Sequence, residues 1–323
     1  MITQILPKQI LDEPKHTEKK LQTNDIIFKF YNTGFTKESE KIKQCGNYLE
    51  FIFKEHQITK DTKKKLANAN FCKNRFCPVC SWRRTRNITG QLKEAFTAIQ
   101  EKEKIATLFL TLTVNNPDVK DLKDTIAKMN KAFKRMSETK RFKNAILGYF
   151  KSIEILGDKT PNGQAHPHFH ILLVVKENYF KKSDYINQKE FLQMWRDATR
   201  NQNITQVDVR RIKSKNENFS DIDSAIAETV KYAVKHSDLC KRTNEDFYYL
   251  YTQTKNLRFI SAGGILKDHL NLIKIDEDLI NLKKENEALW IEICRLIYTW
   301  QNGDYQLKEI KPPKENKEHI ENG

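Results

Sequence analysis

His166-Pro-His-Phe-His-Ile-Leu-Leu-Val-Val175 places three of the chain's eight histidines at alternate positions and leads into an apolar, β-branched run. In an extended strand, side chains at positions i, i+2 and i+4 point to the same face. We therefore expect His166, His168 and His170 to project together, while Phe169 points into a core. Imidazole nitrogens are good ligands for divalent transition metals. The stretch predicts a buried strand with a metal site at its entry, rather than a histidine-rich edge with no ligand.

A second strand is predicted just before the histidines, over residues 149–156, and it contains Glu154. Since a turn over 157–163 joins the two strands, Glu154 can face the histidines across an antiparallel ladder. Two or three histidines and one carboxylate suit Mn²⁺ or Mg²⁺ and leave coordination positions for substrate oxygens. The alternative is that Glu154 is an ordinary surface residue on a strand.

The elements around these two strands follow the order of an α+β domain with an antiparallel sheet. A strand over 106–114 alternates Thr with Leu or Val and stops at Asn115-Asn116-Pro117. Helices are expected over 87–101, 121–141, 188–200 and 224–234, and a short strand over 207–212. We expect a central antiparallel sheet that carries the histidines, with helices packed on one face.

The predicted helix over 224–234 carries Glu228 and Tyr232, which are four residues apart and share one face. A phenol with an ordinary pKa of about 10 is a weak nucleophile at neutral pH. Positive charge from Lys231 and Lys235, or a metal that holds the substrate, favours its reaction. Glu228 could accept a proton from water. A tyrosine on a helix is more often a structural anchor, so the evidence for a catalytic role of this pair comes from the predicted metal site that accompanies it.

Cysteine spacing predicts a second metal site. Cys72-x4-Cys77-x2-Cys80 is compact, and Cys45 is the natural fourth ligand. Four thiolates favour tetrahedral zinc. His56 is a weaker candidate for the fourth position, and unmetallated buried thiols are the alternative. The remaining cysteines, Cys240 and Cys294, are interpreted as structural thiols.

Charge indicates a polyanionic partner, because 57 Lys and Arg outnumber 42 Asp and Glu for a net charge of +15 over 323 residues. No apolar run approaches the ~20 residues that span a bilayer, and no leader is evident, so nucleic acid is favoured over a membrane and the cytoplasm is expected. The expected DNA contacts are Trp82, Arg83, Arg84, Arg86, Lys231 and Lys235. Lys63 to Lys65 are interpreted as a solvated basic face.

Several stretches together resemble rolling-circle replication initiators of small plasmids from Gram-positive bacteria, which belong to the HUH (His–hydrophobic–His) endonuclease superfamily. They are Phe71-Cys-Lys-Asn-Arg-Phe-Cys-Pro-Val-Cys80 with Arg83 and Arg84, Phe109-Leu-Thr-Leu-Thr-Val114, Ser152-Ile-Glu-Ile155, His166-Pro-His-Phe-His170, Ala227-Glu-Thr-Val-Lys-Tyr232 and Arg258-Phe-Ile-Ser-Ala-Gly-Gly264. The resemblance implies an HUH-like fold and a role for each matching residue. His168 and His170 match the metal-binding pair, Glu154 a further ligand, Tyr232 the nucleophile and Glu228 the glutamate that replaces a second tyrosine, while His166 is either a ligand or a group that supports one.

The mechanism implied by the resemblance is nicking of single-stranded DNA at an extruded origin hairpin. The tyrosine forms a 5′-phosphotyrosine and releases a 3′-OH that primes synthesis, and the glutamate assists hydrolysis at termination. The expected partners are plasmid origin DNA, including a duplex binding site, and host helicase and polymerase, and the protein could be an oligomer. The expected cofactors are Mn²⁺ or Mg²⁺ at the histidines and structural Zn²⁺ at the cysteines.

Two other function classes stay open. A non-catalytic, zinc-dependent DNA-binding regulator fits the charge and the cysteines but has no need of the histidine strand with Glu228 and Tyr232. A related HUH transposase is disfavoured by the glutamate one turn before the tyrosine. A relaxase of the common kind has its tyrosines before its histidines, whereas Tyr232 follows them.

The sequence divides into four predicted regions. They are a flexible basic arm over 1–24, a zinc-knuckle and DNA-contact region over 25–104, an HUH nickase domain over 105–265, and a helical C-terminal segment with a disordered tail over 266–323.

Overall fold

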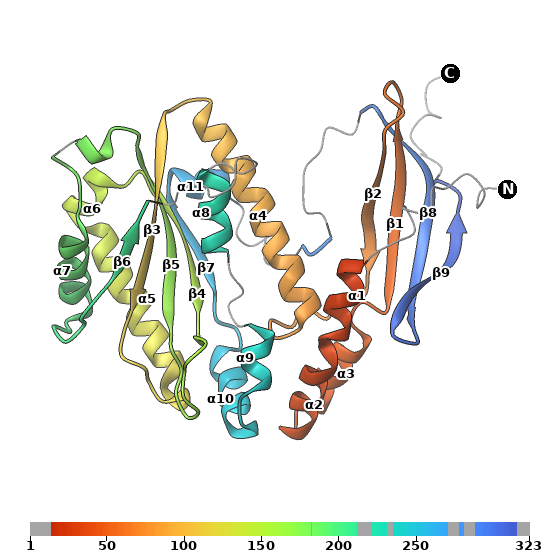
Figure 1. Cartoon of the computed structure of the whole chain (residues 1–323), viewed down its shortest axis with the longest axis horizontal. Helices are drawn as coiled ribbons and strands as arrows, with labels where there is room; N and C mark the ends of the chain where they lie inside the picture. The colour runs from red at the N-terminus through yellow and green to blue at the C-terminus, as the bar shows by residue number, and fades with distance from the viewer. Residues whose placement is uncertain are drawn as a thin grey trace, which may run out of the picture.

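The computed structural model describes residues 14–181, 183–211, 221–230, 235–270, 278–280 and 288–314. These residues form two separate antiparallel sheets with helices between and around them, an α+β architecture (Figure 1). No helix within these ranges is long and apolar enough to cross a membrane.

The larger sheet has five strands in the order β6-β3-β5-β4-β7. Its members are β3 (Ile105–Thr113), β4 (Gly148–Glu154), β5 (His168–Lys176), β6 (Asp208–Arg210) and β7 (Ile260–Gly264). The predicted histidine strand, β5, is central and pairs antiparallel with β3 and β4. The edge strand β7 requires glycine where it meets β4, since a Cβ on Gly263 would lie 2.4 Å from the Tyr149 ring.

Helices cover both faces of this sheet, so the prediction of helices on one face is wrong (Figure 1). One face packs against α5 (Leu122–Glu138), α6 (Lys140–Ala145) and α7 (Gln188–Thr199), and the other against α4 (Pro78–Gln100), α8 (Asp221–Thr229) and α11 (Ile265–His269). The reason lies in β5, where Phe169 and Ile171 point to the first face and Leu172 and Val174 to the second. A strand that is apolar on both sides must be covered on both sides.

The smaller sheet joins the two halves of the chain in the order β2-β1-β8-β9. Its strands are β1 (Tyr48–His56), β2 (Thr62–Ala69), β8 (Trp290–Gln301) and β9 (Asp304–Lys311). Leu49 and Phe51 of β1 pack with Leu296 and Tyr298 of β8 in a core of their own. The prediction of a helical C-terminal segment over 266–323 is therefore wrong for β8 and β9, while its expected disordered tail from residue 315 lies outside the described residues.

The remaining helices lie between the two sheets, at the lower end in Figure 1. They are α1 (Pro14–Leu21), α2 (Thr23–Asn32), α3 (Thr36–Gln44), α9 (His236–Cys240) and α10 (Asn244–Thr254). Elsewhere in the chain, 3₁₀ turns precede α5 at Val119–Asp121 and follow β5 at Tyr179–Lys181. The predicted flexible arm over 1–24 is wrong from Pro14 onward, because α1 and α2 are helical there and His16 is buried edge-on against Trp82. Residues 1–13 lie outside the described part of the chain.

Candidate functional site

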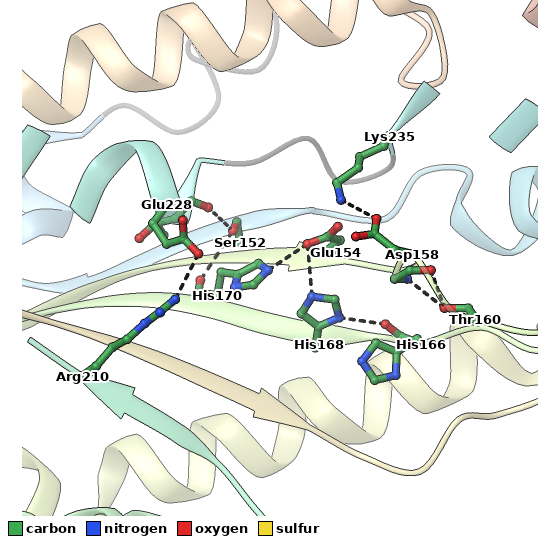
Figure 2. Close-up of polar contacts among 12 residues, drawn as sticks. Ser152, Glu154, Asp158, Thr160, His166, His168, His170, Arg210, Glu228 and Lys235 are labelled. Carbon is green, nitrogen blue, oxygen red and sulfur yellow. Dashed lines mark hydrogen bonds and ion pairs between the residues drawn. The ribbon is translucent and has the colours of Figure 1, made fainter. Parts of the chain in front are cut away.

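Three donor side chains meet at the end of the larger sheet (Figure 2). Glu154 is the last residue of β4 and lies directly opposite His168 in the β4–β5 ladder. One carboxylate oxygen of Glu154, Oε2, is 3.1 Å from Nε2 of His168 and 2.8 Å from Nε2 of His170. All three residues are buried. The predicted cross-strand arrangement of Glu154 and these two histidines is confirmed.

Neighbouring groups fix the orientation of both imidazoles. Nδ1 of His168 lies 2.9 Å from the carbonyl oxygen of His166, and since a carbonyl only accepts, Nδ1–H donates to it while Nε2 is directed at Glu154. The His170 ring stacks on Phe109 of β3, with ring centroids 5.3 Å apart. Both Nε2 atoms are therefore held toward the same point, as metal-binding imidazoles are.

The electrostatics of Glu154 suit a cation site. Burial raises the pKa of this carboxyl, but the hydrogen bonds and charges of His168 and His170 outweigh burial and lower the pKa to about 2. Glu154 therefore carries a negative charge at neutral pH. The three donor atoms lie within 4.8 Å of one another. Two imidazole nitrogens and one carboxylate oxygen fit a divalent metal such as Mn²⁺ and leave coordination positions open.

His166 lies outside this cluster. It precedes β5, and its Nδ1 is 2.6 Å from Oδ1 of Asn116. Burial lowers the pKa of His166, with a further contribution from His168. The sequence left His166 as either a metal ligand or a group that supports one. The geometry favours the supporting role, because the backbone carbonyl of His166 orients the His168 ring while the His166 ring contacts Asn116.

Glu228 lies near the cluster, at the C-terminal end of α8 (Figure 2). Its carboxylate pairs with Arg210 of β6 at 3.2 Å, and the Arg210 guanidinium lies over the Phe109 ring that stacks on His170. The hydroxyl of Ser152, on β4, donates to the carbonyl of Thr229 at 2.6 Å and ties the end of α8 to the sheet.

The helix that carries Glu228 ends at Thr229 and is shorter than the predicted 224–234, and the shared face of Glu228 and Tyr232 stays a prediction. Tyr232 and Lys231 themselves lie outside the described residues. After residues 231–234, the ammonium of Lys235 pairs with Asp158 at 2.7 Å. The hydrogen bond from Lys235 to Asp158 raises the pKa of the lysine. Asp158 follows β4 in the chain, so the described residues on both sides of 231–234 contact the region around Glu154.

The four predicted cysteines also come together. Sγ of Cys45 is 3.5 Å from Sγ of Cys80 and 3.7 Å from that of Cys77, and Cys72 is 3.6 Å from Cys80. Thiolates bound to tetrahedral zinc at ~2.3 Å lie ~3.8 Å apart, so these spacings fit zinc. Burial raises the pKa values of Cys77 and Cys80, whereas hydrogen bonds from the other thiols lower that of Cys72.

His56, the weaker candidate for the fourth position, lies on β1 with its ring against Trp290 and is not part of this group. The cysteine ligand set predicted from the sequence is thus brought together with Cys45 as its fourth member.

Comparison with known proteins decides the family. A family model described as Rep_1, replication protein, matches residues 63–307. The chain belongs to this family. Proteins named "Protein rep" are similar to it: one from Staphylococcus aureus is 35% identical over 245 residues, 75% of this chain and 97% of that protein. Another from Bacillus sp is 32% identical over 295 residues, covering 85% and 93% of the two chains. No solved structure matches.

Membership of the replication protein family confirms the resemblance drawn from the sequence and supports a plasmid replication initiator whose partner is origin DNA. The matched range includes the cysteines from Cys72 onward, the histidine strand and Glu228, and it reaches into β9. A "Protein rep" from Streptococcus pneumoniae is 31% identical over 275 residues, covering 84% of this chain and 79% of that one.

The expected DNA contacts at the start of α4 are largely buried in this replication protein. Trp82, Arg83 and Arg84 are each less than a tenth exposed, and the two guanidiniums bond to backbone carbonyls, that of Arg83 to Leu279 at 2.7 Å. Their burial contradicts the prediction that they face DNA. The physical reason is that both guanidiniums bond to backbone carbonyls of other chain segments instead of pointing to solvent. Arg86 is exposed, lies over the Trp82 ring and stays a predicted contact.

Sequence reasoning missed Ser152, Asp158 and Arg210. Ser152 could have been found, because it precedes Glu154 by two residues and a strand must place both on one face. Arg210 and Asp158 could not be found by spacing, since Arg210 lies on a three-residue strand and Asp158 in a turn.

Proposed function

We propose that this replication protein nicks single-stranded DNA at a plasmid origin by metal-dependent transfer of the scissile phosphate to Tyr232. The convergence of two Nε2 atoms on one Glu154 oxygen carries the proposal. His168, His170 and Glu154 would hold the metal. When bound, Mn²⁺ or Mg²⁺ would polarise the phosphate oxygens and stabilise the charge that develops on them. A non-catalytic regulator gives no reason for this buried donor set.

The Tyr232 phenol releases its proton to solvent, and its oxygen attacks phosphorus to form the P–O bond of a 5′-phosphotyrosine. The bond from phosphorus to the 3′ oxygen breaks, and that oxygen takes up a proton and leaves as a 3′-OH. Support comes from the anchoring of the chain on either side of residues 231–234. Thr229 is bonded to Ser152 on one side and Lys235 to Asp158 on the other, both on the segment that contains Glu154. Lys231 and Lys235 supply positive charge that favours the phenolate and the DNA backbone.

Glu228 acts at termination by taking a proton from a water molecule that hydrolyses the last phosphodiester. Arg210 holds the Glu228 carboxylate beside the Phe109–His170 stack, so Arg210 is a positioning residue. Hydrolysis leaves no covalent adduct to start another round. Between the first nick and this termination step, a host polymerase would extend the 3′-OH released by the first nick while a host helicase unwinds the duplex.

The test is denaturing electrophoresis of the full chain with labelled origin single strands, with Mn²⁺ or with EDTA. Wild type should nick only with metal and leave a covalent protein–DNA band. Tyr232→Phe should lose both, whereas Tyr31→Phe, an exposed tyrosine on α2, should lose neither. Glu228→Ala should keep the first nick and lose hydrolysis. Normal nicking by Tyr232→Phe, or tight binding of a verified origin with no cleavage by wild type, would overturn the proposal.

A further inference from the structure

A third group of donor atoms, made of residues that belong to neither cluster described above, lies where α9 packs against α2. Nε2 of His236 is 3.3 Å from Sγ of Cys240 and 3.6 Å from Oδ2 of Asp25. These three atoms lie within 4.8 Å of one another. The sequence interpreted Cys240 as a structural thiol and gave no role to Asp25 or His236.

Local structure explains why they meet. His236 and Cys240 are four residues apart on α9, so they share one face of the helix. Asp25 lies in the first turn of α2, which contacts α9.

The spacing fits a tetrahedral ion. With Zn–N and Zn–O of ~2.0–2.1 Å and Zn–S of ~2.3 Å, ligand atoms lie ~3.6 Å apart for N and S and ~3.3 Å for N and O. The two separations that involve Nε2 of His236 are within about 0.3 Å of these values, and Sγ of Cys240 lies within 4.8 Å of the Asp25 carboxylate oxygen. One sulfur, one nitrogen and one oxygen are donor types that zinc accepts, and a thiolate with a carboxylate balances its charge.

We propose that Asp25, His236 and Cys240 bind a zinc ion that fastens α9 to α2, with water as the fourth ligand. Binding forms the Zn–S, Zn–N and Zn–O bonds and releases the Cys240 thiol proton to solvent. Because α9 begins next to Lys235, the ion would also fix the chain just after the Lys235–Asp158 pair. The inference is independent of the proposed nicking activity.

The experiment counts zinc in the purified full chain after equilibration in a zinc-buffered solution. His236→Ala and Cys240→Ala should each hold one zinc equivalent fewer than wild type and keep the equivalent at the four cysteines. Cys294→Ala removes a buried thiol of β8 outside this group and should change nothing. Equal zinc content in wild type, His236→Ala and Cys240→Ala would overturn the proposal.

Two further variants guard against a folding artefact. Asp25 has an exposed side chain, so Asp25→Asn should fold normally and weaken zinc binding at this site by about tenfold or more. His236→Cys should retain the zinc equivalent, because a thiolate is also a zinc ligand. Cobalt substitution gives a second readout, since loss of Cys240 should remove the thiolate-to-cobalt absorption of one sulfur only. Unchanged zinc affinity in Asp25→Asn, or unchanged cobalt spectra in Cys240→Ala, would show that the group is only a thiol–imidazole hydrogen bond beside a carboxylate.

Discussion

The cysteine cluster and the Glu154–His168–His170 cluster differ in where their donor atoms come from in the chain. Four thiols gather from the ends of α3, β2 and the start of α4, so the cluster ties three segments together and can fill a tetrahedral shell completely. The second cluster takes three donors from two neighbouring strands and can leave positions open. A complete shell from distant segments suits a structural ion, and an incomplete shell on a rigid sheet suits a reactive one.

The largest effect is expected from Cys77→Ala, because it opens the complete shell. The zinc equivalent at the four cysteines should be lost, and the free energy of unfolding should fall by at least about 4 kcal/mol, since metal binding and folding are coupled. Zinc analysis and urea unfolding measure both quantities. The matched control is Cys294→Ala, a buried thiol outside the cluster, which should keep its zinc. If Cys77→Ala and Cys294→Ala lost the same stability and held the same amount of zinc, the cysteine cluster would not be a structural zinc site.

His170→Ala should break the incomplete shell without unfolding the protein. We expect nicking to fall by about a thousandfold, or about 4 kcal/mol of transition-state stabilisation. His166→Ala is the control, because its ring lies outside the cluster and its backbone carbonyl, which orients His168, remains. It should cost less than about tenfold. Similar losses in the two variants would show that the cluster includes His166 after all. Initial nicking rates at saturating Mn²⁺ decide the matter.

Lys151 lies on β4 but on the face opposite Glu154. Substitution of Lys151 therefore tests whether nicking depends only on the face of β4 that carries Glu154. Its buried ammonium lies 3.8 Å from the centre of the Phe169 ring, and burial lowers its pKa to about 7. The unfolded chain keeps this proton up to a pKa of about 10.4, so it binds more protons than the folded chain between these values. Wild-type stability should therefore rise with pH from about 7 to about 10.

Lys151→Met removes the charge and should raise stability at pH 6 by about 2 kcal/mol, while the rise above pH 7 disappears. Nicking should not change, because Lys151 and Glu154 point to opposite faces of the strand. Thermal unfolding across this pH range measures the effect, with the exposed Lys131→Met as control. A lower nicking rate in Lys151→Met would mean that the two faces are coupled.

The same contrast between local and distant contacts explains what the sequence could predict. β3, β4 and β5 were predicted within two residues of their ends, and Glu154 was placed opposite the histidines, because alternation and one turn are local signals. The smaller sheet was missed because β8 pairs with β1 from the other end of the chain. Such pairing leaves no spacing rule in the sequence.

One local signal for that sheet was nevertheless present. Asn302-Gly303 follows the alternating residues of β8, and both residues have positive φ, as the tight hairpin between β8 and β9 requires. The buried arginines of α4 show the opposite limit. Whether Arg83 faces DNA or a backbone carbonyl depends on Leu279, a residue about 200 positions away, so composition alone cannot distinguish the two.

The smallest effect is expected from Ser152→Ala, which tests how the reactive cluster is joined to α8. Ser152 donates to the carbonyl of Thr229, next to Glu228, so its loss leaves a buried carbonyl unpaired at a cost of about 1 kcal/mol. Nicking should slow by about fivefold with unchanged Mn²⁺ affinity, because the metal ligands do not move. Zinc content should also stay constant, since the cysteine cluster has no contact with this hydroxyl. Ser137→Ala, on the opposite side of the sheet, controls for loss of a hydroxyl. A fall in Mn²⁺ affinity instead of rate would assign Ser152 to the metal site, and the end of α8 would then have no separate part in the reaction.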